Sequence, residues 1–167
     1  MKKLNTVILN LTVAILDFLY RGRDIQRFWV LETIARAPYF AFLSVLHFKE
    51  SLGLRTESHF YLMKEHFAQT VNETEHLTEM ESRGGASAWI DRFLAYHLVL
   101  VYYWVNVAYY FILPRAAYHL AAEVELHATH TYGEYLTRYP DDQKIIAIMN
   151  DEVHHYQELT WAMEKIK

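Results

Sequence analysis

The chain has no cysteine and few of the residues that interrupt regular structure. Without cysteine among its 167 residues, it forms no disulfide and has no thiolate for catalysis, so any metal must bind carboxylate oxygen or imidazole nitrogen. It has only 5 glycines and 3 prolines, fewer than the many turns of an all-β chain require. Since apolar residues make up 53% of the chain, these absences favour an all-α fold.

The chain also lacks any long run of charge of one sign. Its formal net charge is -4, with both signs scattered, so it offers neither a basic stripe for nucleic acid nor an acidic tail. Nucleic-acid binding is therefore not expected. A chain of this length can bury one hydrophobic core, which predicts a single domain over residues 1–167.

Two apolar stretches are typical of helices that bind a membrane. Aromatic residues make up 16% of the chain and include 13 tyrosines, a residue type favoured where membrane meets water. We expect an anchoring helix at about residues 5–20 and a second apolar helix at about residues 88–113. Residues 93–113 contain no Asp, Glu, Lys or Arg, but they do contain His97 and Asn106. A helix lying in the interface therefore fits this stretch at least as well as one that crosses the bilayer.

Start and stop signals predict four further helices. Asp24 is expected to cap the first of them, Pro38 to kink it and Gly53 to end it. Ser58 is expected to open the next. The four helices are predicted at about residues 25–52, 58–82, 115–138 and 143–165.

Two Glu-x-x-His pairs lie on these helices, Glu73 with His76 and Glu152 with His155. Residues three apart on a helix share one face, so each pair can hold one metal ion. A chain with 10 histidines produces such pairs easily by chance, and the pairs alone prove little.

The order of the glutamates along the chain is stronger evidence for a metal site than the two pairs alone. A lone Glu32 precedes the first pair and a lone Glu125 precedes the second. This order matches the ligand pattern of ferritin-like bundles that hold two metal ions. Glu32 stands in the apolar run 28–35, where an unpaired carboxylate would be costly. Glu125 lies on a more polar helix. Its neighbours in the sequence favour an ordinary solvated glutamate over a metal ligand.

Four ordered segments resemble the iron-binding motifs of the plastid terminal oxidases, which are relatives of the mitochondrial alternative oxidases. The segments are Leu-Glu-Thr-Ile-Ala-Arg-Ala-Pro-Tyr at 31–39, Asn-Glu-Thr-Glu-His-Leu at 72–77, Val-Glu-Leu-His-Ala at 124–128 with Thr-Tyr at 131–132, and Asn-Asp-Glu-Val-His-His at 150–155. The resemblance runs from about residue 27 to 155. Since the long N-terminal extension and the insert of plant plastid forms are missing, the chain resembles a compact bacterial or phage-type form.

The resemblance implies roles for particular residues. Two iron ions would be held by Glu32, Glu73, His76, Glu125, Glu152 and His155. Asn72 and Asp151 would orient these ligands, and Tyr132 occupies the position of the family's redox-active tyrosine, although it is also one of 13 tyrosines. Four positions match residues that line the family's quinol pocket, namely Arg27, Leu31, Ala128 and Thr131. From the sequence alone, Arg27 is interpreted equally well as a surface arginine at a helix start and as a quinol-binding residue.

The resemblance also implies a fold and an activity. The fold would be a ferritin-like four-helix bundle with a di-iron site and two additional apolar helices lying on one leaflet of a thylakoid or plasma membrane. The activity would be oxidation of plastoquinol or ubiquinol by O2 to give water, without proton pumping. Assembly into a homodimer is a further expectation of the family. Two alternatives remain open: a membrane-bound di-iron hydroxylase of a quinone precursor, and a non-enzymatic iron-storage protein or scaffold.

Overall fold

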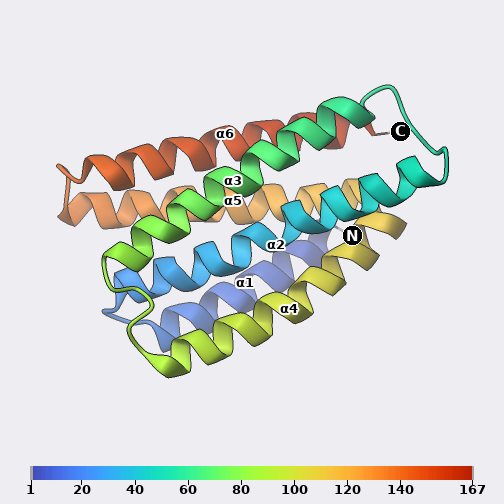
Figure 1. The fold of residues 1–167 in the computed structure, drawn as a ribbon. Helices are drawn as coiled ribbons and strands as arrows, with labels where there is room; N and C mark the ends of the chain where they lie inside the picture. Colours follow the sequence, from blue (N-terminus) through green and yellow to red (C-terminus); the bar gives the residue numbers. More distant parts are fainter. Residues whose placement is uncertain (1, 167) are drawn as a thin grey trace. The chain divides into compact units, whose positions relative to one another are not determined.

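The computed structural model describes residues 2–166, and every regular element within them is an α-helix. The helices are α1 (Lys2–Leu19), α2 (Asp24–Ser51), α3 (His59–Ser82), α4 (Trp89–Ile112), α5 (Pro114–Arg138) and α6 (Gln143–Lys165) (Figure 1). The predictions of an all-α fold and of six helices in this order are confirmed over the described residues.

The chain divides into two compact units. One comprises Met1–Ile15 and Pro114–Lys167, and the other comprises Leu16–Leu113. Helix α1 contributes its first part to one unit and its end to the other.

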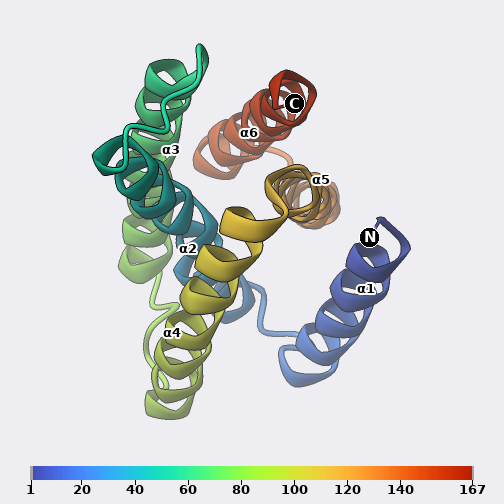
Figure 2. The same ribbon diagram turned by 90° about the vertical axis from the view of Figure 1, so that its right-hand side faces the viewer.

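The unit that contains α5 and α6 is built on a helical hairpin. These two helices pack side by side and run in opposite directions, joined by the short connection 139–142 (Figures 1 and 2). The Asp142 carboxylate caps α6, since Oδ1 accepts a hydrogen bond from the Ile145 amide at 3.3 Å. The first part of α1 is attached by Asn5, whose side-chain amide donates to the Ala116 carbonyl at 2.8 Å.

In the other unit, α2 packs against both α3 and α4. Helix α2 runs antiparallel to α3 and parallel to α4 (Figure 1). Large aromatic side chains fill its inner faces, and Trp29, Tyr39 and Phe42 are fully buried. The ring of Phe42 lies 4.5 Å from that of Tyr110 on α4, measured between centroids. Interlocked aromatic rings of this size hold the three helices together.

The start of α2 is held by the connection between α3 and α4. A Cβ atom added at Gly85 would lie 2.5 Å from Cβ of Trp29 and 2.9 Å from the Met80 carbonyl oxygen, so only glycine fits there. The Trp29 indole N–H also donates to Oε1 of Glu81 at 3.3 Å. Helix α2 is therefore fixed against the end of α3 within its first two turns.

The sequence signals for helix ends were only partly correct. Gly53 and Gly84 follow the ends of α2 and α3 with φ angles of +72° and +83°. Positive φ angles are expected of glycines that end helices. The prediction that Asp24 caps α2 was wrong, because Arg23 is the N-cap residue and Asp24 is the first helical residue. An acidic residue in the first turn still favours the helix dipole there. Ser58 precedes α3 as expected but makes no side-chain capping bond, and α2 continues through Pro38.

Helices α1 and α4 each expose large apolar side chains. On α1 they recur at the helical spacing of one face, at Leu4, Val7, Ile8, Leu11 and Ile15. On α4 the exposed set is Trp89, Ile90, Phe93, Leu94, Leu98, Leu100, Val101, Trp104, Val105, Phe111 and Ile112. Exposed apolar faces of this extent mark surfaces that bind lipid or another apolar partner.

The helix whose hydropathy and length would allow it to cross a membrane is neither α1 nor α4. Among the described residues, only α2 is long and apolar enough to cross a membrane by these two criteria, and 61% of its most apolar window is buried inside the protein. Burial of this kind is typical of a core helix, and α2 supplies the core of its unit.

Gly85→Ala should destabilise the protein by about 1–3 kcal/mol, because the new methyl group would overlap Trp29 and backbone atoms that cannot move aside. Gly133→Ala is the control. Gly133 lies inside α5 with only the Met149 sulfur within reach of an added Cβ, at 3.9 Å, so alanine should stabilise that helix by about 0.5–1 kcal/mol. Urea unfolding of the two variants checks the signs, and equal effects would contradict the steric argument.

His66 on α3 is a buried titratable residue in the aromatic core. Its ring lies 5.2 Å from that of Phe42 and 6.1 Å from that of Tyr39, measured between centroids, and Nδ1 hydrogen-bonds to Oε1 of Gln69 at 2.9 Å. Burial lowers the pKa of His66 from 6.5 to about 4, while the bond to Gln69 opposes this effect.

Stability should therefore fall on acidification between pH 6.5 and 4. In this window the unfolded chain binds a proton at His66 and the folded chain does not, so each step down in pH favours unfolding. His66→Gln removes this contribution. Between pH 7 and 4.5 the variant should lose about 2 kcal/mol less stability than the original protein, as measured by urea unfolding. Other titrating groups are common to both proteins and cancel, so equal losses would contradict the assignment.

Candidate metal centre

In the unit that contains α2 and α3, three predicted ligands come together. Glu73 and His76 lie one turn apart on the face of α3 that packs against α2, and Glu32 lies on α2. One potential ligand atom from each side chain lies within 4.8 Å of the other two, and all three residues are buried. Nδ1 of His76 is 3.7 Å from Oε2 of Glu32.

The hairpin of α5 and α6 holds a second cluster of the same composition. Glu125 on α5 and Glu152 and His155 on α6 are buried, and their potential ligand atoms also lie within 4.8 Å of one another. Nδ1 of His155 is 3.3 Å from Oε2 of Glu152. The sequence around Glu125 favoured an exposed residue, but its side chain is buried beside other potential metal ligands.

Each cluster has the chemistry of a metal site. Two carboxylates within a few ångströms of each other repel, and burial adds a desolvation cost that a bound cation would offset. Oxygen and imidazole donors suit iron, manganese or zinc. The predicted ligand residues therefore offer carboxylate and imidazole donors that suit a divalent or trivalent metal ion.

The residues predicted to support the ligands lie directly beside them in the chain. Asn72 precedes Glu73 and Asp151 precedes Glu152, and both are partly buried. Tyr132 is buried on α5, two helical turns after Glu125. A separation of seven residues places Tyr132 and Glu125 on nearly the same face of that helix, about 10 Å apart along its axis.

The four predicted quinol residues lie on two helices, one in each unit. Arg27 and Leu31 are one turn apart on α2, while Ala128 and Thr131 lie on α5, where the Thr131 hydroxyl donates to the His127 carbonyl at 3.0 Å. Arg27 also forms an ion pair with Asp17, which sequence reasoning missed. Both residues are charged and close in sequence, but only the fold shows that they meet.

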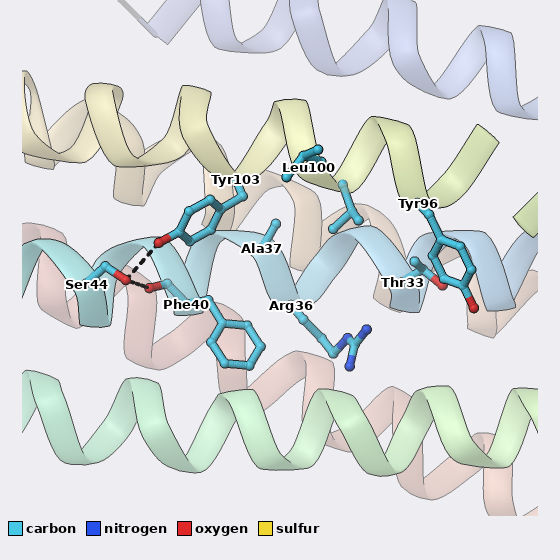
Figure 3. Close-up of a pocket in the computed structure, with 9 residues that line it drawn as sticks. Thr33, Arg36, Ala37, Phe40, Ser44, Tyr96, Leu100 and Tyr103 are labelled. Atoms are coloured by element: carbon cyan, nitrogen blue, oxygen red, sulfur yellow. Dashed lines mark hydrogen bonds between the residues drawn. The ribbon is translucent and has the colours of Figure 1, made fainter. Parts of the chain in front are cut away.

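A separate groove lies between α2 and α4. Its volume is about 570 Å³, and it is lined by Thr33, Arg36, Ala37, Phe40, Ser44, Tyr96, Val99, Leu100 and Tyr103. The hydroxyls of Ser44 and Tyr103 hydrogen-bond at 2.9 Å at one end of the groove, and Thr33 and Tyr96 lie at the other (Figure 3). The lining includes none of the predicted site residues. Packing of two helices creates this groove, so the sequence contained no local signal for it.

An all-helical fold with buried carboxylate and imidazole clusters is the arrangement of helical carboxylate metalloproteins. Comparison with known proteins defines the family more closely. The family model described as "Alternative oxidase" matches residues 6–165, and the chain belongs to the alternative oxidase family. This result confirms the family resemblance inferred from the four motifs.

One curated relative is "Ubiquinol oxidase 4, chloroplastic/chromoplastic" from Arabidopsis thaliana. It is 44% identical to the chain over 152 residues, which cover 91% of this chain. The chain spans 43% of that relative's length. No solved structure gives a significant match.

Glu73→Gln should lower the iron content of the purified protein, because it removes a charged oxygen donor from the cluster on α2 and α3. Glu75→Gln is the matched control, since Glu75 is an exposed glutamate on the same helix. Metal analysis after reconstitution with ferrous iron measures the effect, and circular dichroism checks that both variants fold. Equal iron content in the two variants would remove Glu73 from the ligand set.

Proposed function

We propose that the protein is a quinol:oxygen oxidoreductase that oxidises plastoquinol or a related quinol and reduces O2 to water without pumping protons. The observation that carries this proposal is the pair of buried Glu/His clusters in a chain of the alternative oxidase family. The relative from Arabidopsis is named as a ubiquinol oxidase, which supports a quinol as the substrate.

In this proposal the six clustered residues are the ligands of two iron ions. They are Glu32, Glu73, His76, Glu125, Glu152 and His155. The family is one of di-iron carboxylate oxidases, and the oxygen and imidazole donors fit iron. When bound, the two irons supply the redox chemistry that takes electrons from the quinol and passes them to O2. Asn72 and Asp151 hold the ligand side chains in orientation, as the neighbours of metal ligands commonly do.

Other residues bind the quinol and complete the electron supply. Arg27 donates a hydrogen bond to a quinol oxygen, and Leu31, Ala128 and Thr131 line the quinol pocket. Tyr132 is proposed as a further electron donor during O2 reduction, releasing its phenolic proton with the electron. Its burial supports this role, because a buried phenol is shielded from side reactions with solvent.

We propose that the protein lies on one leaflet of a thylakoid or plasma membrane. The family is membrane-associated, and the exposed apolar faces of α1 and α4 support lipid contact by these two helices. A quinol dissolved in the lipid would then reach the protein without crossing water. Homodimer formation remains a prediction of the family resemblance, and sedimentation in detergent would measure it.

Membranes that contain the protein should consume O2 with a short-chain plastoquinol or ubiquinol when cytochrome oxidases are blocked by cyanide. Glu73→Gln should abolish this uptake, whereas Glu75→Gln should retain it, because only Glu73 belongs to a buried cluster. Comparison of the rates with the two quinols identifies the preferred substrate.

Product analysis separates the proposed oxidase from a hydroxylase. An oxidase yields quinone and water, whereas a hydroxylase inserts an oxygen atom into its substrate. Folded, iron-loaded protein that consumed no O2 with either quinol would overturn the proposal.

A further inference from the structure

The groove between α2 and α4 combines an apolar wall with a positive charge. Ala37 and Phe40 of α2 and Val99 and Leu100 of α4 supply the apolar wall. Arg36 also lines the groove, and its side chain extends from α2 on the side away from α4 (Figure 3). The groove volume of about 570 Å³ lies within the roughly 300–1,000 Å³ of small-molecule sites. The groove can therefore hold part of a ligand that has an apolar end and a charged end.

Arg36 has no counter-ion among the residues that the structure describes. Its Nε is buried without a hydrogen-bond partner, and its guanidinium forms no ion pair with any of them. Arg23, Arg27 and Arg83 of the same unit each pair with a carboxylate. An anionic oxygen at Arg36 would satisfy both the buried donor and the charge. Because the formal net charge of the chain is -4, the binding of an anion here must depend on local contact with Arg36.

A second hydrogen-bond donor lies in the same part of the groove. The Tyr96 hydroxyl makes no hydrogen bond with the described residues, and the side chain is about half exposed. At the other end of the groove, the hydroxyls of Ser44 and Tyr103 already bond to each other at 2.9 Å. Figure 3 shows the Arg36 guanidinium and the Tyr96 hydroxyl in the half of the groove away from that pair. The donors that remain available therefore lie together in one half of the groove.

Helix α4 connects this groove to a surface suited to lipid. Leu100 lines the groove and is exposed, as are Val101 and Trp104 on the same helix. An acyl chain in contact with α4 would reach the apolar wall of the groove without crossing water, and its headgroup would then lie at Arg36. Basic pockets between helices at a membrane surface bind anionic headgroups. The planar guanidinium of arginine suits the oxygens of a phosphate.

We propose that this groove binds an anionic membrane phospholipid. Arg36 and the Tyr96 hydroxyl hold the phosphate, and an acyl chain lies against Phe40 and Leu100. The site rests on the lipid contact proposed for α4 and does not require the oxidase activity. A quinol would also fit the apolar wall, but it is uncharged and would leave Arg36 without a counter-ion. Because the lipid contacts both helices, it stabilises the packing of α2 on α4.

Native mass spectrometry of the full chain in detergent measures the first lipid that binds. Phosphatidylglycerol should bind about tenfold more tightly than phosphatidylcholine with the same acyl chains, because only its headgroup has a net negative charge for Arg36. Arg36→Gln should weaken phosphatidylglycerol binding about tenfold and abolish this preference, and Tyr96→Phe should weaken it about threefold. Arg21→Gln is the matched control. It removes the same charge from an exposed position and should change the affinity by less than about twofold.

Further measurements separate loss of the site from loss of the fold. Circular dichroism checks that each variant is helical. Arg36→Lys keeps the charge but not the planar set of donors, so its affinity for phosphatidylglycerol should lie between those of the original protein and Arg36→Gln. Phosphatidylglycerol should also raise the midpoint of thermal unfolding of the original protein more than that of Arg36→Gln. An equal rise in the two proteins would contradict binding at Arg36.

Several outcomes would overturn the proposal. Equal phosphatidylglycerol affinities in Arg36→Gln and Arg21→Gln would remove Arg36 from the site. Displacement of the lipid by an equal concentration of glycerol phosphate would assign the site to a free phosphate ester, and displacement by a short-chain quinone would assign it to the quinol. If Arg36→Gln dissociated a dimer and left lipid binding unchanged, a second copy of the chain would be the occupant. An original protein that bound neither lipid would overturn this site together with the lipid contact of α4, whereas oxygen uptake tests the oxidase function separately.

Discussion

Burial of closely spaced carboxylates is the constraint on which the rest of the structure depends. Glu32 and Glu73 in one unit, and Glu125 and Glu152 in the other, are buried with their oxygens close together, and each pair has a histidine beside it. Repulsion and desolvation oppose such an arrangement. Long helices with large side chains in their cores can hold these groups in place, because a side chain on a packed helix has little freedom to turn toward water.

Helix α2 shows how the surrounding fold meets this constraint in its unit. It has neighbours on two sides, and its first turns are held by the close approach of Gly85 to Trp29 and by the ion pair of Arg23 with Asp91. Glu32 and Arg27 follow within the same few turns. Because an α-helix is stiff, fixing its start also fixes the direction of these two side chains. The same contacts on one helix therefore orient both Glu32, a proposed metal ligand, and Arg27, a proposed quinol-binding residue.

Exposure, rather than hydropathy, distinguishes the helices that can meet lipid. Average hydropathy and length select α2, most of whose apolar window is buried in the core. Helices α1 and α4 do not meet these two criteria, yet their large apolar side chains are exposed. Asn106 on α4 is buried, and its amide donates to the Tyr102 carbonyl at 2.8 Å. Asn106 was one of the polar residues that left the membrane role of this stretch undecided from sequence. Its amide is hydrogen-bonded inside the protein, so it does not interrupt the apolar outer face of α4.

The sequence by itself determined the helical class, the order of the helices and the family, because these depend on local spacing and on ordered motifs. The placement of Glu73 and His76 on one face needs only the helical repeat. The helix caps were predicted less well, since Arg23 and not Asp24 takes the N-cap position of α2. Only the tertiary structure decided which carboxylate meets which arginine. Asp17 pairs with Arg27, while Arg23 reaches across 68 residues of sequence. The physical reason is that such pairs depend on distance through space, which helix packing sets and which no local pattern encodes.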